Sequence, residues 1–203
     1  MKDLYSKKYN IRFYNAPKNS MTSMIRMLGL DWVEVEDMPN DHQVCVVIRE
    51  PYDRFISAFL QTKSNTNSCF NGGSNNHAYR DISLETLTKI FKSEPEVSVR
   101  EYINEIKING FFDNHQLTQD YYFGGCLHRD INKIDIYIDF KDLENEARQK
   151  IDKDIKIFKL NTKNPIEKKT YGDLFEKYRE DIINLYKNDS ALYEKYKQGG
   201  NKV

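Results

Sequence analysis

The stretch "QVCVVIREPYDRFISAF", residues 43–59, joins a run of β-branched residues to a helical pattern. Residues 44–48 are continuously apolar, which is typical of a strand covered on both faces in a parallel sheet. Pro51 then suits the first turn of a helix, and aromatic and aliphatic residues recur at helical spacing after it. The sequence therefore predicts a buried strand that runs directly into a helix, with Arg49 at the carboxyl end of the strand.

A similar unit precedes it in "YNIRFYNAPKNSMTSMIRML", residues 9–28. We expect a strand over residues 9–14, a turn that contains Lys18, and a helix to Leu28. Such a turn directs backbone N–H groups and the positive end of a helix dipole at one place, where anions bind. Hydroxyl groups from Thr22 and Ser23 would add donors. The alternative is that a hydroxyl group merely caps the helix. A Walker A loop, with its glycines, is absent.

The rest of the chain alternates between strand-like and helix-like segments. We expect strands over residues 32–36, 134–140 and 155–160, and a long polar loop over residues 63–81. Helices are expected over residues 84–92, 97–108, 141–151, 173–187 and 190–197. This alternation predicts an α/β fold with a central, mostly parallel sheet and helices on both faces. Neither an internal repeat nor a linker divides the sequence, so we expect a single domain over residues 1–203.

Composition excludes several classes of protein. The 203 residues include 31 Lys and Arg and 31 Asp and Glu, so the net charge is zero and gives no argument for a nucleic acid or membrane partner. No apolar run of about 18 residues occurs, and the N-terminus does not resemble a signal peptide. We therefore expect a cytoplasmic protein. The Cys and His residues do not show the spacing of metal ligands, so no metal is expected.

Arg49 stands where ligands bind in open α/β sheets, at the carboxyl end of a strand. An arginine in this position is able to clamp a phosphate through two parallel hydrogen bonds. Ser57, two turns into the next helix, is placed to contact the same anion. The structural alternative is that Arg49 pairs with Glu50 or Asp53 at the surface.

Two motifs together resemble the donor site of sulfotransferases, most closely the carbohydrate sulfotransferases related to the heparan 2-O and HNK-1 enzymes. They are P-K-x-x-x-T-S, residues 17–23, and R-E-P-x-x-R-x-x-S-A, residues 49–58. The resemblance implies a P-loop-like three-layer fold and the donor 3′-phosphoadenosine 5′-phosphosulfate (PAPS), with adenosine 3′,5′-bisphosphate (PAP) as product. It assigns the 5′-phosphosulfate to the first loop, with Lys18, Asn19, Ser20, Thr22 and Ser23. It assigns the 3′-phosphate to Arg49 and Ser57.

The C-terminal part extends the resemblance. In the family, an asparagine leads into a basic loop that covers the nucleotide, and a helix ending in Y-x-x-D follows. The corresponding residues are Asn161, the basic residues Lys163, Lys168 and Lys169, and finally Tyr186 and Asp189. The alternative is a solvated run of charge before a helix.

The segment "DNHQLTQ", residues 113–119, resembles the family's D-x-H-x-x-x-Q stretch on the acceptor side. The resemblance implies His115 as the base for the acceptor hydroxyl and Gln119 as a residue that orients the acceptor or the sulfate. Lys18 is the candidate to stabilise the leaving phosphate. His77 is a weaker candidate on the acceptor side. Glu34 or Glu36 would replace a histidine if the base is a glutamate.

The sequence therefore predicts a sulfotransferase that moves a sulfuryl group from PAPS to a hydroxyl group of a saccharide or other small acceptor. Two alternatives stay open. One is a P-loop-like nucleotide or small-molecule kinase. The other is a relative that binds PAP or PAPS without turnover, which the bulky Met21 in the first loop would favour.

Overall fold

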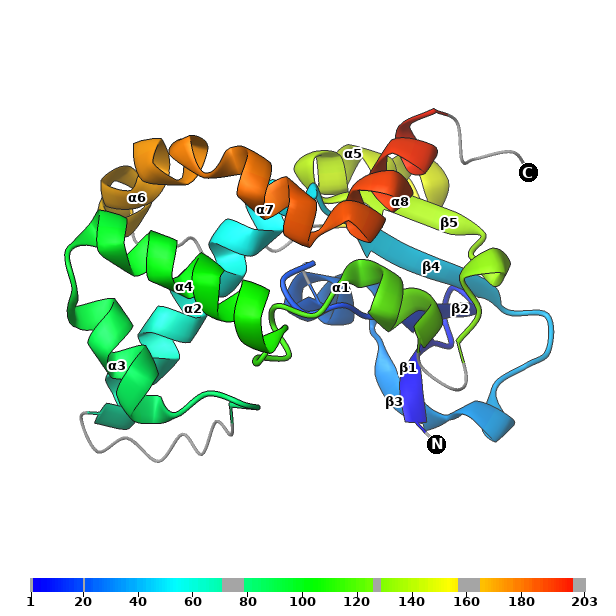
Figure 1. The fold of residues 1–203 in the computed structure, drawn as a ribbon. Coiled ribbons are helices and arrows are strands. Elements are labelled where there is room, and N and C mark those ends of the chain that lie inside the picture. The colour runs from blue at the N-terminus through cyan, green and yellow to red at the C-terminus, as the bar shows by residue number, and fades with distance from the viewer. Residues whose placement is uncertain (1, 20, 71–78, 126–128, 157–164, 199–203) are drawn as a thin grey trace. The chain divides into compact units, whose positions relative to one another are not determined.

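The computed structural model describes residues 2–19, 21–70, 79–125, 129–156 and 165–198, with only the backbone at 70 and 165–169. The chain divides into two compact units (Figure 1). The sheet unit comprises residues 1–50, 118–161 and 188–203, and the helical unit comprises residues 51–117 and 162–187. The single domain expected over residues 1–203 stays a prediction.

Five strands form the sheet in the order β3-β1-β2-β4-β5 (Figure 1). They are β1 (Lys2–Ser6), β2 (Ile11–Tyr14), β3 (Asp31–Glu34), β4 (Gln43–Ile48) and β5 (Ile136–Asp139). β1 is antiparallel to both β2 and β3, whereas the pairs β2–β4 and β4–β5 are parallel. The sheet is mixed, so the expectation of a mostly parallel sheet is wrong. The α/β class itself is confirmed.

The strand β1 was not predicted, because two of its buried side chains are polar. Asp3 and Ser6 are both fully buried. Ser6 Oγ donates to Leu28 O at 2.5 Å, and Asp3 accepts hydrogen bonds from Arg12 and Arg129. These partners come from other parts of the sequence, so no apolar alternation marks the strand in advance.

The parallel half of the sheet confirms the prediction for residues 43–49. All side chains from Val44 to Ile48 are buried. Cys45 and Val47 belong to a core cluster with residues of the helices α1 (Met21–Leu28) and α5 (Leu143–Lys150). The alternate residues of β4 belong to a second cluster with Leu192 and Tyr193 of α8 (Lys187–Lys197). Because successive side chains of a strand point to opposite faces, helices cover both faces of the sheet.

The strand β3 lies at the edge of the sheet and ends at Glu34, two residues earlier than expected. It carries Trp32, the only tryptophan in the sequence, with 55% of its surface exposed. The described residues of the unit also form short 3-10 helices, η1 (Val35–Asp37), η3 (Ile131–Lys133) and η4 (Phe140–Asp142), and a π-helical segment, η2 (Tyr121–Gly125). Of the strand expected over residues 155–160, only Ile155 and Lys156 are described, and both are irregular.

The helical unit is built around aromatic rings. Its helices are α2 (Pro51–Phe70), α3 (Leu84–Lys92), α4 (Pro95–Asn109), α6 (Pro165–Lys177) and α7 (Arg179–Leu185). The ring of Phe59 meets the rings of Tyr102, Tyr171 and Phe175 edge to face, with centroids 4.9, 5.3 and 5.2 Å away. Such edge-to-face pairs add to the stability that burial alone provides.

The helix α2 continues through part of the segment expected as a loop. Residues 63–70 are helical, although their composition is polar. Thr62 and Thr66 are fully buried, and Thr62 Oγ1 lies 3.0 Å from Ala58 O and 3.1 Å from Asp113 Oδ2. The polar residues of this helix therefore face a buried polar network, which composition alone does not reveal. The rest of the expected loop, residues 71–78, lies outside the described residues.

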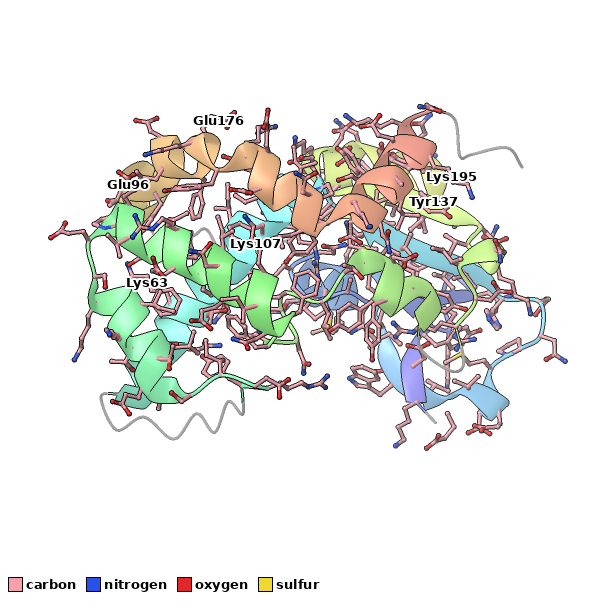
Figure 2. The ribbon with its side chains drawn as sticks, viewed as in Figure 1. Lys63, Glu96, Lys107, Tyr137, Glu176 and Lys195 are labelled. Atoms are coloured by element: carbon pink, nitrogen blue, oxygen red, sulfur yellow. The ribbon has the colours of Figure 1, made fainter. Side chains whose placement is uncertain are left out.

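The C-terminal helices have other bounds than expected, and α8 begins at Lys187 rather than at residue 190. The helix expected over residues 173–187 is divided between α6 and α7, which meet at Tyr178. Ion pairs on the surface join α4 to these two helices: Glu96 with Lys177 and Lys107 with Asp181. Figure 2 labels Glu96 and Lys107 on α4.

Candidate functional site

The turn between β2 and α1 is short and contains no glycine. Lys18 adopts a φ of 69°, in the left-handed region that favours glycine. Asn19 N donates to Ala16 O at 3.2 Å and closes the turn. α1 begins at Met21, so strand, turn and helix follow one another as predicted. Lys18 is half-buried.

The first turn of α1 exposes one hydroxyl-bearing residue and buries the other. Thr22 is exposed, whereas Ser23 is buried. The bulky Met21 packs against the core cluster of α1, and its Sδ accepts a hydrogen bond from Asn15 Nδ2 at 3.1 Å. The thioether is therefore engaged by the protein itself. Ser20 lies outside the described residues.

Asn19 anchors the turn to the sheet. Its side chain is 1% exposed, and its Nδ2 donates to Val47 O at 2.7 Å and to Gln119 Oε1. The side chain predicted to help bind the donor thus points into the protein. Its donor atoms fix the turn against the parallel strand β4.

Arg49 follows β4 and reaches the same turn. Its NH1 donates to Lys18 O at 2.8 Å, and its guanidinium group lies 4.3 Å from the centroid of the Phe140 ring. Arg49 and Lys18, which the sequence placed on two different turns, therefore lie together in the sheet unit. Both side chains are half-buried, and both are donors only. An anion is the ligand that such a pair fits.

Gln119 and Asp189 lie behind Arg49 and are fully buried. Gln119 Oε1 accepts from Arg49 N, and Gln119 Nε2 donates to Arg49 O, both at 2.8 Å. Asp189 accepts from Asp120 N at 3.1 Å and from Gln119 Nε2 at 3.5 Å. The backbone of Arg49 is therefore held by a side chain 70 residues later in the chain.

A second buried network ties down the start of the turn. Arg129 NH2 donates to Asp3 Oδ1 at 2.6 Å and to Asn15 Oδ1 at 2.8 Å. Arg12 lies on the other side of Asp3, with its NH2 3.1 Å from Asp3 Oδ2. Buried carboxylates need such pairing, because an isolated charge in the interior is costly.

His115 lies in the helical unit, in the loop that follows α4. Its Nδ1 is 2.7 Å from Asp113 Oδ1, and its backbone N donates to the same oxygen at 2.8 Å. The histidine side chain is 25% exposed and that of Asp113 is 4% exposed. Because Nδ1 faces a carboxylate, the neutral ring carries its proton there and keeps a lone pair on Nε2. That is the tautomer that a general base requires.

The carboxylate of Asp113 is stabilised in its charged form. Burial raises the pKa of this group, but hydrogen bonds from the His115 ring and backbone and from the Thr62 hydroxyl outweigh burial, so the pKa lies below its ordinary value. Asp113 therefore remains ionised at neutral pH and holds the imidazole in one orientation.

A fully buried arginine supports the loop that carries His115. Arg54 donates to Gln116 O and Leu117 O. Gln116 Oε1 accepts from Phe112 N at 2.9 Å and Gln116 Nε2 donates to Tyr102 OH. Burial raises the pKa of Tyr102 well above its ordinary value, so the phenol stays neutral. The loop is thus fixed by buried polar partners on both sides.

Three further predicted site residues are described: Ser57, Lys168 and Lys169. Ser57 is on α2 in the helical unit and is 3% exposed, so its partnership with Arg49 stays a prediction. Lys168 and Lys169 belong to the helix α6 rather than to a loop, and their side chains are not described. The remaining predicted residues fall outside the described residues: His77, Asn161 and Lys163.

The two glutamates weighed as alternative bases lie at the edge of the sheet unit. Glu34 ends β3 and is 3.9 Å from Lys2 Nζ, and its side chain is 42% exposed. Glu36 lies in the turn η1 that follows. Neither residue shares the buried support that surrounds His115.

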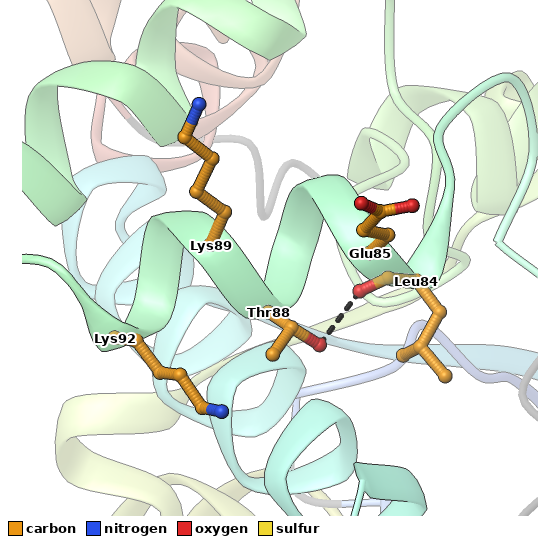
Figure 3. A pocket seen from close by; sticks show the side chains of 5 residues that line it. All are labelled: Leu84, Glu85, Thr88, Lys89 and Lys92. Carbon is orange, nitrogen blue, oxygen red and sulfur yellow. Dashed lines mark hydrogen bonds between the residues drawn. The ribbon is translucent and has the colours of Figure 1, made fainter.

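A shallow pocket lies along α3 in the helical unit (Figure 3). Thr88 Oγ1 donates to Leu84 O at 2.7 Å, which turns this hydroxyl back onto the helix. The residues that line the pocket are Leu84, Glu85, Thr88, Lys89 and Lys92. None of them belongs to the predicted site.

The described residues contain no group of three or more His, Cys, Asp or Glu side chains placed to hold a metal ion. Within the same residues, no helix has the length and apolar character needed to cross a membrane.

The residues that the sequence analysis missed are those that support the site. Asp113, Gln116 and Arg129 were not assigned roles, and Arg54 was noted only as part of a motif. The D-x-H spacing was the one available signal for the first, because an acidic residue two positions before a histidine is within reach of its ring. The partners of the others come from distant segments, which a single sequence does not connect.

Comparison with known families gives one match. The model of the sulfotransferase family matches residues 4–197, which is nearly the whole chain and includes the turn at Lys18, the strand end at Arg49 and the loop of His115. No curated protein and no solved structure matches the chain.

Proposed function

The chain belongs to the sulfotransferase family, and we propose that it transfers a sulfuryl group from PAPS to a hydroxyl group of a saccharide or another small acceptor. Sulfuryl transfer follows from the family. The donor and the class of acceptor are the proposal. The observation that carries it is the hydrogen bond that joins Arg49 to the turn at Lys18, which brings two cations to one place in the sheet unit.

The donor set at this place fits a bisphosphorylated nucleotide. Lys18 and Arg49 offer positive charge and N–H donors, and the exposed Thr22 offers a hydroxyl group at the start of α1. Charge-assisted hydrogen bonds to phosphate are among the strongest in proteins, and the N-terminus of a helix favours an anion. We assign the 5′ side to Lys18 and Thr22, and the 3′ side to Arg49 with Ser57.

His115 is the proposed base. In the transfer, the acceptor oxygen forms a bond to sulfur, the bond from sulfur to the 5′-phosphate oxygen breaks, and the hydroxyl proton moves to His115 Nε2. Asp113 fixes the ring and stabilises the imidazolium that results, since its Oδ1 is 2.7 Å from Nδ1. Lys18 is assigned to the charge that builds on the departing phosphate.

The proposal is tested by thermal unfolding of the chain with PAP, AMP or ATP at equal concentrations. A ligand present at about 100 times its dissociation constant adds roughly 2.7 kcal/mol to the free energy of unfolding. For a chain of this size, we expect PAP to raise the Tm by about 5 to 10 °C. AMP lacks the 3′-phosphate and is expected to give a much smaller shift.

A shift with ATP alone would favour the kinase reading and overturn the assignment of the donor. A shift with PAP is followed by an assay of radiolabelled sulfate transfer from PAPS to a panel of saccharides. Binding of PAP with no transfer to any acceptor would instead favour a relative that binds the nucleotide without turnover.

A further inference from the structure

Gln119 has no hydrogen-bonding capacity left for a ligand. A side-chain amide offers two N–H donors and an oxygen with two lone pairs. In the sheet unit, Nε2 donates to Arg49 O and Asp189 Oδ2, and Oε1 accepts from Arg49 N and Asn19 Nδ2. The side chain is also 0% exposed. A residue in this state is unable to contact the acceptor or the sulfate, whereas the family resemblance implied that it orients one of them.

The same four bonds fix which way the amide faces. Arg49 N and Asn19 Nδ2 are donors, so the atom near both must be the amide oxygen. Arg49 O and the Asp189 carboxylate are acceptors, so the atom near both must be the amide nitrogen. Only one orientation of the Gln119 amide satisfies all four partners.

The pairing with Arg49 imitates a neighbouring strand. Gln119 contacts both the N–H and the C=O of Arg49 at 2.8 Å, as the backbone of another strand would do at the next position of the sheet. Its oxygen also accepts a hydrogen bond from the side-chain amide of Asn19. The backbone N–H of the same asparagine closes the turn after β2. One side chain therefore fixes the turn of Lys18 and the strand end of Arg49 at a constant spacing.

We infer that Gln119 is a positioning residue of the donor site, which locks the Lys18 turn to the Arg49 strand end through Asn19 and the Arg49 backbone, with Asp189 behind it. This inference rests on the proposed function for the identity of the ligand. It moves Gln119 from the acceptor side to the donor side. Affinity for an anion held by both segments then depends on a residue that never contacts that anion.

The variant Gln119→Glu tests the inference with little change in size. The glutamate keeps one oxygen that accepts from Arg49 N and Asn19. Its second oxygen replaces the donor Nε2 and faces two acceptors, Arg49 O and the Asp189 carboxylate, so a buried negative charge is left without a donor. We expect the Kd for PAP, measured by titration calorimetry, to rise roughly tenfold or more. The second substitution Asp189→Asn removes the carboxylate that faces the introduced glutamate. The double variant is therefore expected to recover part of the affinity for PAP.

The matched control is Gln149→Glu, which adds the same charge at an exposed position of α5 in the same unit. Its Kd for PAP is expected to equal that of the unsubstituted chain. If Gln119 were needed only for folding, a smaller fraction of the Gln119→Glu chains would bind PAP. Calorimetry would then show a lower stoichiometry and an unchanged Kd. An unchanged Kd would therefore overturn the inference.

Hydrogen exchange of the ligand-free protein gives a second measurement that needs no nucleotide. In Gln119→Ala, the amide of Arg49 loses its acceptor, so we expect that amide to exchange faster, together with the amide of Asn19 in the turn. Unchanged exchange rates at both amides would overturn the inference that Gln119 joins the turn to the strand end. If the unsubstituted chain does not bind PAP, the proposed function fails and the donor-site role fails with it, while the exchange data still decide whether Gln119 joins the two segments.

Discussion

Each of the two units holds a candidate site residue by means of a buried glutamine that binds backbone atoms, yet the surroundings of the two residues differ. In the sheet unit, Gln119 binds the backbone of Arg49 and leaves the cationic side chain half-buried. In the helical unit, Gln116 binds the backbone N atoms of Phe112 and Asp113 and holds the loop from which His115 extends. Both glutamines are fully buried.

The difference lies in the charge of the surroundings. The His115 loop rests on hydroxyl groups, a buried arginine and one ionised carboxylate, so the imidazole has a negative partner. The turn at Lys18 and Arg49 presents positive charge instead. A base needs a partner that stabilises the proton it gains, whereas an anion site needs positive charge and hydrogen-bond donors. The two arrangements fit the separate roles that we propose for His115 and for Lys18 with Arg49.

The variant that separates the two tasks most clearly is His115→Ala. We expect transfer to fall by about 10² to 10⁴ fold, the usual contribution of a general base. The Kd for PAP is expected to stay as it is, because the donor residues Lys18 and Arg49 are intact. Rates from a PAPS assay and Kd values from calorimetry provide the test. Undiminished transfer would mean that another residue, such as Glu34, is the base.

Arg49→Ala is expected to have the opposite profile. Loss of the charge-assisted contacts to phosphate should weaken PAP binding by about 10 to 100 fold. Arg26→Ala, which removes one positive charge from the exposed face of α1, serves as the control and should bind PAP normally. Equal affinity in the Arg49 variant and the control would remove Arg49 from the donor site.

Asp113→Asn sharpens the comparison through pH. Because the pKa of Asp113 is lowered in the folded protein, its ionised form stabilises the fold above the pKa of the unfolded chain, and this contribution disappears as pH falls through the folded value. We expect the variant to lose about 1 to 3 kcal/mol at pH 7.

Urea unfolding at several pH values measures this effect. The difference in free energy of unfolding between the two proteins should narrow below about pH 4, near the ordinary pKa of aspartate. A difference that stays constant down to pH 3 would mean that the charge of Asp113 is not what stabilises the loop.

The smallest effect is expected at the surface of the helical unit, for Lys107→Ala. Lys107 Nζ is 2.7 Å from Asp181 Oδ1, but the two side chains are 43% and 45% exposed. Exposed pairs of this kind contribute about 0.2 to 1 kcal/mol. The same urea series should show a change within that range. A loss as large as that of Asp113→Asn would contradict the distinction between buried and exposed pairs.

The local sequence pattern was enough to predict the strand and the helix on either side of Arg49. The β-branched run of residues 44–48 and the proline at the start of α2 predicted strand and helix correctly, because each depends on neighbours within one or two turns. The juxtaposition of Lys18 and Arg49 was implied by the resemblance of their two motifs to a sulfotransferase donor site.

Elements that depend on distant partners were not predicted. β1 carries a buried aspartate whose two arginine partners are 9 and 126 residues away. The polar second half of α2, residues 63–70, was predicted to be a loop, because Asp113, the partner of Thr62, is 51 residues away in the sequence. The role that we infer for Gln119 was not predicted for the same reason, since four bonds to three separate segments define it. Pairing across such distances is a property of the folded chain and is not visible in the local sequence.

The single exposed tryptophan on β3 makes this protein convenient to follow by optical spectroscopy. Trp32 belongs to the sheet unit, so its fluorescence reports on the unfolding of that unit. Far-ultraviolet circular dichroism is dominated by helices, and the two longest, α2 and α4, belong to the helical unit. Both signals can be recorded from one sample during heating. Coincident curves would show that the two units melt as one cooperative block, and separate curves would rank their stabilities.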